Sequence, residues 1–510
     1  MDWLDILRIV LAAITAAGSA VAFRHFLHMF QLNSYKPHVQ RQWEEKNRKQ
    51  FFWKLRVPLA GGFFFWPKPK EQVKIPLKYT ARVKRLIATA AVLTALWYVF
   101  IMWLVWIGDL DRWWFVFCEL VYLWVWQTGA NELVRLANWI NGPMEKAIRG
   151  RYTKDAMKKL DAHSNLTVIG ITGSYGKTSM KHYLNTLLRA KFNVLMTPGS
   201  INTPMGVVKV VREELNAAHE IFICEMGAKQ GGDIRELCEI ARPQYGILTS
   251  VGPQHLESFL TIENVVATKF ELANALPSDG MLFANADNEY IANHLEKYSN
   301  VTMYSAGSEG NGYHTKDIAV SERGTAFTIV TPAGEEERFE TRLIGEHNVV
   351  NLAGAITVAA FLGIPLKKLR GEMRKIEPVA HRLELFDRGD TLVIDDSYNS
   401  NPAGAKAALD TLALFAGMKI LVTPGMIELG PKQEELNKVF GTQAAAVCDV
   451  IVLVGAAQTE PIQEGVLEAG FAPERLIVVD TLREGMARVN AMPSAHRKVI
   501  LLENDLPDNF

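Results

Sequence analysis

The residues best suited to chemistry form a glycine-rich loop within VIGITGSYGKTSMKHYL, residues 168–184. A β-branched run leads into the loop, and a helical pattern opens immediately after it. Glycines permit the tight backbone that turns amide groups toward phosphate oxygens, and a helix N-terminus adds partial positive charge. Lys177 can bridge the β- and γ-phosphates, and the Thr178 hydroxyl can bind Mg²⁺. The residues expected to hold the phosphates are Gly173, Ser174, Gly176, Lys177, Thr178 and Ser179.

The elements that must position this loop alternate between strand and helix patterns. Short β-branched runs occupy residues 166–172, 193–197, 220–225 and 245–250, each followed by turn residues and then a helical stretch. Repeated βα units predict a parallel sheet with helices on both faces. Residues 300–345 alternate with a period of two instead, which predicts antiparallel hairpins at one edge.

A second α/β series follows, joined to the first near residues 383–390. The fold class is therefore α/β: a P-loop parallel-sheet ATPase domain, then a Rossmann-like α/β domain, both preceded by an α-helical membrane domain. The expected domain ranges are 1–150, 151–383 and 384–510. The strands of the second series are expected at residues 391–395, 419–423, 449–455, 475–480 and 498–503.

Composition excludes several classes of protein. The 510 residues suit three or four structural units, and the formal net charge of zero gives no global field for nucleic acid, so no nucleic-acid partner is expected. The four cysteines are scattered without a CxxC pair. That spacing argues against a disulfide framework or a zinc ribbon and suits a reducing compartment.

Three apolar stretches lie in the first 130 residues. Residues 86–108 carry no charge, and their length reaches the roughly 20 helical residues that span a bilayer core. Residues 9–23 follow an acidic segment, which argues against the alternative of a signal peptide. Residues 113–130 contain one carboxylate, and an interfacial helix is the alternative there. Tryptophans cluster around the turn at 109–112, as at a headgroup interface.

Charge distribution sets the expected topology. The stretch 24–85 is rich in Lys and Arg and holds three acidic residues, so the positive-inside rule makes it a basic cytoplasmic loop. The nucleotide loop must lie on the same side, which requires an even number of crossings between the two. The sequence thus predicts a multi-pass protein of the bacterial cytoplasmic membrane. It would have three spans, an outside N-terminus, cytoplasmic catalytic domains and an oligomer formed through the membrane domain.

The nucleotide loop is shorter than the general GxxxxGK form, because Ile171 stands where that form begins. This shortened loop resembles the ATP loop of the Mur ligase superfamily. The similarity is greatest to the branch that adds D-Ala-D-Ala to a muramoyl tripeptide, and it implies ATP, a central ATPase domain and a C-terminal α/β domain. Further segments match the family in order: 202–206, 224–234, 241–259, 267–272, 284–288, 345–355, 381–385, 395–402 and 424–430.

The resemblance assigns two Mg²⁺ ions to a set of side chains. It implies that Glu225 binds Mg²⁺ together with Thr178, although a strand-end glutamate by itself is as often a turn residue. His255 would be a second metal ligand, where a lone histidine is more often structural. Lys269 would carry a carbamate formed from CO₂, which needs a neutral, buried amine, whereas the plain alternative is a solvated helix face. The residues expected to act in catalysis are Lys177, Lys269, His255 and Arg382.

The resemblance also assigns the rest of the nucleotide. His347, Asn348 and Asn351 would hold the base, with Asn351 the best candidate for adenine. Arg382 would contact the γ-phosphate near the interdomain hinge, since a guanidinium suits a transferring phosphoryl group. Asp396 ends the first strand of the last domain and would contact the ribose.

The function implied is an ATP-dependent ligase that joins a carboxylate to an amine through an acyl-phosphate. Residues 1–150 stand where the family has its UDP-sugar domain, which favours a membrane lipid or lipid-linked glycan of cell-wall biogenesis as the acceptor. An amino acid or dipeptide would be the donor. The alternatives within ligases are the D-Ala-D-Ala-adding reaction of peptidoglycan synthesis and polyglutamate synthesis. A membrane-associated P-loop ATPase is the alternative outside the class.

Two features depart from the D-Ala-D-Ala-adding branch. The C-terminal segment LLENDLPDNF, residues 501–510, lacks the basic loop expected there. Glu503, Asp505 and Asp508 either bind a substrate ammonium group or belong to a solvated tail. Asn437 stands where the family often has His.

Overall fold

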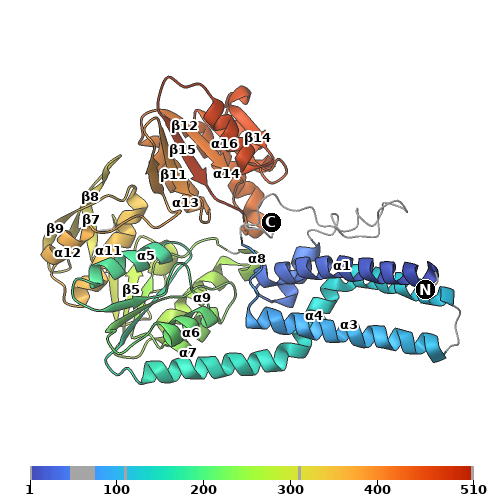
Figure 1. Cartoon of the computed structure of the whole chain (residues 1–510). Helices are drawn as coiled ribbons and strands as arrows, with labels where there is room; N and C mark the ends of the chain where they lie inside the picture. Colours follow the sequence, from blue (N-terminus) through green and yellow to red (C-terminus); the bar gives the residue numbers. More distant parts are fainter. Residues whose placement is uncertain are drawn as a thin grey trace. The chain divides into compact units, whose positions relative to one another are not determined.

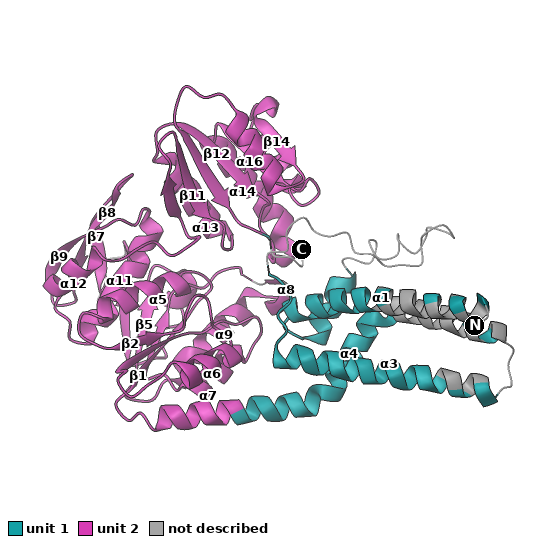
Figure 2. Cartoon of the chain, viewed as in Figure 1, with its two compact units in different colours: residues 1–151, 506–510 teal, residues 152–505 magenta. Residues whose placement is uncertain are grey.

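The computed structural model describes residues 3–45, 75–107, 112–254, 256–307, 310 and 312–506. The chain divides into two compact units (Figure 2), one over Met1–Arg151 with Leu506–Phe510 and the other over Tyr152–Asp505. The first unit is helical, and the second holds every strand that the structure describes.

Three long helices form most of the first unit: α1 (Trp3–Leu32), α3 (Ala81–Ile107) and the part of α4 (Arg112–Asp161) that precedes Tyr152. They lie side by side (Figure 1) and share one apolar cluster. A buried chain of amides runs between them, since Asn33 Nδ2 donates to Gln40 Oε1 at 2.8 Å and Gln40 Nε2 donates to Asn131 Oδ1 at 2.9 Å. The cluster consists of Ala22, Phe26, Leu27, Phe30, Val83, Leu86, Ala90, Ala130, Leu133, Val134 and Ala137.

The predicted three-span membrane topology is wrong. Among the residues described, one helix, over Ala81–Phe100, is long and apolar enough to cross a membrane by length and composition. Residues 9–23 are part of α1, and residues 113–130 begin α4, a 50-residue helix whose later turns are rich in charged side chains. A single candidate removes the even number of crossings on which the predicted topology depended.

The expected basic loop 24–85 is helical at its described ends. Helix α1 continues to Leu32, residues 37–45 are helical, and α3 begins at Ala81. The central part of this stretch, residues 46–74, lies outside the described residues.

The second unit begins with a parallel sheet of strand order β2-β3-β1-β4-β5-β6, which confirms the predicted α/β class. Alternate residues of β1 face opposite layers: Val168 packs with α6, α7 and α9, while Ile169 and Ile171 pack with α5, α11 and α12. The strands are β1 (Thr167–Thr172), β2 (Val194–Met196), β3 (Ile221–Glu225), β4 (Tyr245–Leu248), β5 (Met281–Asn285) and β6 (Val301–Tyr304). The helices are α5 (Lys177–Leu188), α6 (Pro204–Glu213), α7 (Asp233–Ala241), α8 (Leu256–Phe259), α9 (Ile262–Ala275), α10 (Glu289–Ala292), α11 (Glu346–Phe361) and α12 (Leu366–Met373).

The predicted antiparallel hairpins form a separate three-stranded sheet, β7 (His314–Ser321), β8 (Gly324–Val330) and β9 (Glu336–Thr341). Phe327 and Phe339 stack across β8 and β9 with ring centroids 5.8 Å apart. Both rings belong to the same apolar cluster as α5 and α11, so this small sheet completes one face of the nucleotide-loop domain.

The last sheet has the order β10-β11-β15-β12-β13-β14 and is parallel except for β10, which runs antiparallel to β11. Its strands are β10 (Glu384–Asp387), β11 (Thr391–Asp396), β12 (Met418–Thr423), β13 (Val450–Val454), β14 (Leu476–Val479) and β15 (Lys498–Glu503). Its helices are α13 (Pro402–Ala413), η1 (Gly430–Lys432), α14 (Gln433–Val447), α15 (Glu460–Glu468), η2 (Pro473–Arg475) and α16 (Leu482–Ala491).

Helices α14 and α15 pack at glycines, which yields a stability prediction. A Cβ added at Gly465 would meet the backbone carbonyl oxygen of Lys438, and one added at Gly441 would meet that of Ile462. We expect Gly465→Ala to lower the free energy of unfolding by about 1–3 kcal/mol, because the backbone must shift. Gly371→Ala in α12 meets open space and should be neutral or stabilising by up to about 1 kcal/mol. Denaturant unfolding measures both, and equal stabilities would contradict the close packing.

Candidate nucleotide and metal site

The glycine-rich loop connects β1 to α5 and is fixed to the loop that follows β4. The Ser174 amide donates to the Ser250 carbonyl at 2.6 Å, and the Ser174 hydroxyl donates to the Gly252 carbonyl at 3.1 Å. Gly176 has φ of 80°, in the left-handed region that favours glycine, and it caps the N-terminus of α5. A Cβ at Gly176 would lie 2.6 Å from Asn351 Oδ1, so the loop also depends on a close approach by α11.

Lys177 lies across this loop. Its Nζ donates to the carbonyls of Gly173 at 2.7 Å and Ser174 at 3.0 Å. Burial lowers the pKa of Lys177 to about 8, against the attraction of the Glu225 carboxylate. The side chain is therefore folded over the turn whose amides would surround a phosphate.

Glu225 ends β3, the neighbour of β1 in the sheet, and lies within reach of α5. Thr178 Oγ1 donates to both carboxylate oxygens at 3.2 and 3.1 Å, and Asn202 Nδ2 donates to Oε1 at 3.1 Å. Lys181 Nζ donates to Oε2 at 2.8 Å, and both side chains of that ion pair are buried. Burial alone would raise the pKa of Glu225, but the charges of Lys181 and Lys177 and the Asn202 hydrogen bond together lower it.

Sequence reasoning missed Lys181. A signal for it exists, because Lys181 follows Thr178 by three residues and Lys177 by four, which places it on the same face of α5. The spacing alone does not identify the partner of Lys181, because Glu225 lies on a strand 44 residues away in the sequence.

Lys269 lies in α9 and is buried. Burial and the nearby positive charge of Lys177 lower the pKa of Lys269 well below its usual range. No hydrogen bond or ion pair to its ammonium is found among the described residues. His255, the predicted second metal ligand, lies outside them.

The residues predicted to hold the base differ in how they are bonded. Asn348 is buried, accepts from the Tyr183 hydroxyl at 2.8 Å and donates to the Ile344 carbonyl at 2.9 Å. Asn351 Nδ2 donates to the His347 carbonyl at 3.2 Å, and its Oδ1 faces Gly176. Burial lowers the pKa of His347 to about 4, so its ring is neutral at physiological pH. Asn348 thus fixes the start of α11, while Asn351 contacts the nucleotide loop directly.

Arg382 extends from the segment before β10 toward the same loop. Its Nη2 donates to Thr178 Oγ1 at 3.4 Å, and its guanidinium lies 4.4 Å from the centroid of the Tyr398 ring. The next amide, that of Leu383, donates to Asp396 Oδ1 at 3.2 Å. Burial raises the pKa of Asp396 to about 6, against the lowering effect of Arg382. Arg382 therefore contacts the nucleotide loop, and Asp396 contacts the backbone directly after Arg382.

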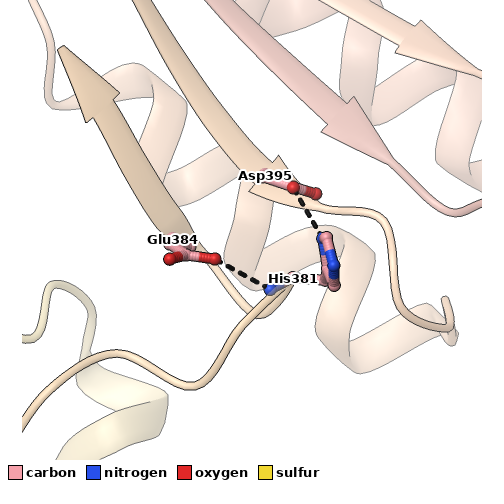
Figure 3. A group of neighbouring side chains, drawn as sticks. All are labelled: His381, Glu384 and Asp395. Carbon is pink, nitrogen blue, oxygen red and sulfur yellow. Dashed lines mark hydrogen bonds and ion pairs between the residues drawn. The ribbon is translucent and has the colours of Figure 1, made fainter.

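Beside Arg382, the side chains of His381, Glu384 and Asp395 form a group (Figure 3) in which each offers a potential ligand atom. His381 Nδ1 lies 2.8 Å from Asp395 Oδ2, and the His381 amide donates to Glu384 Oε2 at 3.2 Å. These hydrogen bonds fix the turn before β10, and they explain why the three side chains lie close together.

Asn437, expected at a family histidine position, is buried and fully bonded. It accepts from the Met426 amide at 2.9 Å and donates to the Met426 carbonyl at 2.9 Å and the Gln433 carbonyl at 2.8 Å. Its position is structural, since it clamps the loop that follows β12.

A parallel sheet whose first strand runs through a glycine-bounded Lys-Thr loop into a helix defines a P-loop nucleoside-triphosphate-binding protein. Two family profiles match the second unit: the Mur ligase middle domain over residues 171–359 and the Mur ligase glutamate ligase domain over residues 381–502. The chain belongs to the Mur ligase family. Both matches begin after residue 170, so the helical unit lies outside them.

Individual relatives carry the name of a ligase of the same family. UDP-N-acetylmuramoyl-tripeptide–D-alanyl-D-alanine ligases from Bacillus subtilis and Escherichia coli are 32% and 30% identical over 277 and 292 residues. These matches cover 54% and 56% of this chain, but 59% and 64% of the relatives, so the chain spans less than two thirds of their length.

Solved structures give the same fold. MurF ligase from Thermotoga maritima in complex with ADP has a TM-score of 0.63 and 26% identity, covering 70% of this chain and 80% of that one. MurF from Acinetobacter baumannii has a TM-score of 0.64 at 24% identity, covering 71% and 78%, and supports the fold alone.

The buried ion pair of Lys181 and Glu225 yields a stability prediction. We expect Lys181→Met to lower the free energy of unfolding by about 3–5 kcal/mol, because it leaves a buried carboxylate without its ammonium. The double variant Lys181→Met/Glu225→Gln should lose less than the sum of the single variants. Denaturant unfolding of all three measures this.

Lys209→Met is the matched control, since Lys209 pairs with Glu213 at 3.8 Å on an exposed face of α6. It should cost at most about 0.5 kcal/mol. Additive effects of the two buried substitutions would show that Lys181 and Glu225 are not energetically coupled.

Proposed function

We propose that this chain is an ATP-dependent ligase that forms an amide bond between a carboxylate and an amine through an acyl-phosphate. D-alanyl-D-alanine would be the amine, and a UDP-linked muramoyl tripeptide would be the acceptor. The observation that carries the proposal is the presence, in chain order, of both Mur ligase domains around a loop in which Lys177, Thr178 and Glu225 converge. The names of the relatives point to these substrates.

This UDP-linked acceptor differs from the lipid-linked acceptor that the sequence favoured. The lipid-linked acceptor depended on three membrane spans, and the described residues contain one candidate span. A UDP-linked acceptor is also the one that the relatives' names specify. The helical unit lies outside the matched ranges, so these matches give no account of how that unit would contact the acceptor.

The loop supports ATP as the phosphoryl donor. Backbone amides from Gly173 to Thr178 would surround the β-phosphate at the N-terminus of α5. Lys177 and Arg382 would bind the γ-phosphate from two sides, since both already lie on this loop. Asn351 is the proposed contact to adenine, and Asp396 is the proposed contact to the ribose. Both positions are carried over from the family resemblance.

Thr178 and Glu225 are the proposed ligands for Mg²⁺. The donor set fits, because a hydroxyl and an ionised carboxylate are the hard oxygen ligands that Mg²⁺ prefers, and the pKa of Glu225 is lowered. A bound Mg²⁺ would neutralise charge on the β- and γ-phosphates. His255 and a carbamate on Lys269 are the proposed ligands of a second ion.

The chemistry follows from these positions. An acceptor carboxylate oxygen attacks the γ-phosphorus, the bond to the β-γ bridging oxygen breaks, and ADP leaves. The amine gives up the proton of its ammonium form and its nitrogen attacks the acyl carbon. The C–N bond forms, the nitrogen releases a second proton to solvent, and phosphate departs with the electron pair of the C–O bond. Lys177 and Arg382 stabilise charge on the transferring group. Water must be excluded, since an acyl-phosphate hydrolyses.

The proposed activity is tested with the purified full chain, ATP, Mg²⁺ and UDP-N-acetylmuramoyl tripeptide. Phosphate release should depend on added D-alanyl-D-alanine, and mass spectrometry should detect one addition. We expect Lys177→Ala to lower the rate by about 10²–10³-fold or more, because it removes charge stabilisation of the transferring phosphoryl group.

Two other results of this assay would indicate a different activity. A product ladder with glutamate would indicate polyglutamate synthesis. Phosphate release that is equal with and without an amine would indicate an ATPase. Either result would refute the proposed ligase.

Lys269 gives a separate prediction, because burial lowers its pKa well below the usual range and so favours the neutral amine that reacts with CO₂. Activity should fall when CO₂ is removed below neutral pH and return on adding bicarbonate. Activity falls as pH falls because protonation of the Lys269 amine removes the form that holds CO₂ as a carbamate. Lys269→Ala should lose about 10²-fold or more of the activity and should no longer respond to bicarbonate. An enzyme equally active with and without CO₂ would contradict a carbamate.

A further inference from the structure

The backbone on either side of Arg382 is bonded to the turn that follows β11. On one side, the Leu383 amide donates to Asp396 Oδ1 at 3.2 Å. On the other side, the His381 carbonyl accepts a hydrogen bond from the Tyr398 amide at 3.2 Å. The turn after β11 therefore holds the peptide from which the Arg382 side chain extends, and it brings the Tyr398 side chain beside that peptide.

The Arg382 guanidinium contacts a hydroxyl and an aromatic ring. Its Nη2 donates to Thr178 Oγ1 at 3.4 Å, and its Cζ lies over the Tyr398 ring, 4.4 Å from the centroid. That distance is well within the roughly 6 Å over which a ring face attracts a cation. Among the described residues, no carboxylate forms an ion pair with Arg382, and no second acceptor takes a hydrogen bond from its side chain. A neutral ring thus holds this charge in place of an acid.

A ring leaves free what an acid would occupy. The donors of a guanidinium lie in its plane, and attraction to the face of an aromatic ring uses none of them. A carboxylate partner would take two of those donors and would cancel the positive charge. Arg382 therefore keeps both the charge and the donors that binding of a phosphoryl group requires.

The ring of Tyr398, and not its hydroxyl, makes this contact. Tyr398 is 45% exposed, and its hydroxyl forms no hydrogen bond with any residue that the structure describes. Phenylalanine at this position would present the same ring face to Arg382, whereas leucine would remove it. The two substitutions therefore separate the ring from the rest of the side chain.

We propose that Tyr398 is a positioning residue that holds the Arg382 guanidinium, through the face of its ring, where the γ-phosphate of ATP binds. This inference rests on the proposed ligase function, in which Arg382 contacts that phosphate. ADP lacks the γ-phosphate, so loss of the ring should weaken the binding of ATP and leave the binding of ADP unchanged.

The test measures nucleotide binding without turnover. Dissociation constants of ADP and of the non-hydrolysable ATP analogue AMP-PNP are determined by calorimetry, with Mg²⁺ and the full-length chain. The ratio of the two constants isolates the contribution of the γ-phosphate, because the nucleotides share every other group. Thermal unfolding of each variant shows that it is folded.

We expect Tyr398→Leu to reduce the preference for AMP-PNP over ADP by about 3–10-fold, because it removes the cation–π contact. Tyr398→Phe should keep the wild-type preference, since it keeps the ring. Arg382→Met should reduce the preference at least as much as Tyr398→Leu, because the ring acts only through the guanidinium.

Tyr152 in α4 provides a matched control. The Arg212 guanidinium lies over its ring at 4.2 Å from the centroid, and Tyr152 is 40% exposed. Tyr152→Leu thus removes a contact of the same kind and similar exposure, and it should leave the preference for AMP-PNP unchanged.

Other results would overturn the inference in ways that can be told apart. A preference that survives in Tyr398→Leu but is lost in Arg382→Met would refute the positioning role and leave the proposed ligase intact. Equal losses in Tyr398→Phe and Tyr398→Leu would assign the effect to the hydroxyl and refute the role of the ring. A wild-type protein that binds neither nucleotide would refute the proposed function and the inference together.

Discussion

The buried carboxylate of Glu225 is the constraint on which the candidate site depends. A carboxylate at the end of a central strand is costly to bury, and here the side chains of Thr178, Asn202 and Lys181 donate to it. Because Thr178 and Lys181 belong to α5, the ion pair also fixes how that helix begins. The nucleotide loop is therefore held at both ends, by β1 on one side and by the carboxylate of β3 on the other.

The second unit follows closely from local sequence signals. Short β-branched runs separated by amphipathic stretches predict parallel sheets, and β1, β3, β4, β11 and β15 all begin or end within two residues of the expected positions. The loop residues Gly173 to Thr178 were identifiable because strand, glycines, Lys-Thr and helix occur in one contiguous segment. Signals of this kind can be read from the sequence because they depend on residues that are neighbours along the chain.

The rest could not be predicted for physical reasons. Lys181 and Glu225 meet where helix α5 packs beside the end of β3, and Asp396 and Glu503 are brought together by strand register. No local pattern contains either relation. The first unit misled in another way. Apolar helices that pack on each other and helices that cross a bilayer have the same composition, and Phe26, Leu86 and Val134 pack into a shared cluster. Hydropathy reports how apolar a helix is. It does not report whether that apolar surface packs against other helices or against lipid.

Arg382 lies between His381 and Leu383, whose φ angles of 60° and 51° are both in the left-handed region. Such a conformation is costly for residues with a Cβ and persists only when surrounding bonds hold it, here those to Asp395 and Asp396. The two backbone torsions on either side of Arg382 thus help to direct its guanidinium toward Thr178. Relaxing either torsion would withdraw the charge from Thr178, and by reciprocity an anion bound there would stabilise the strained backbone. The conformation of the peptide that links the two sheets would then be coupled to occupation of the phosphate site.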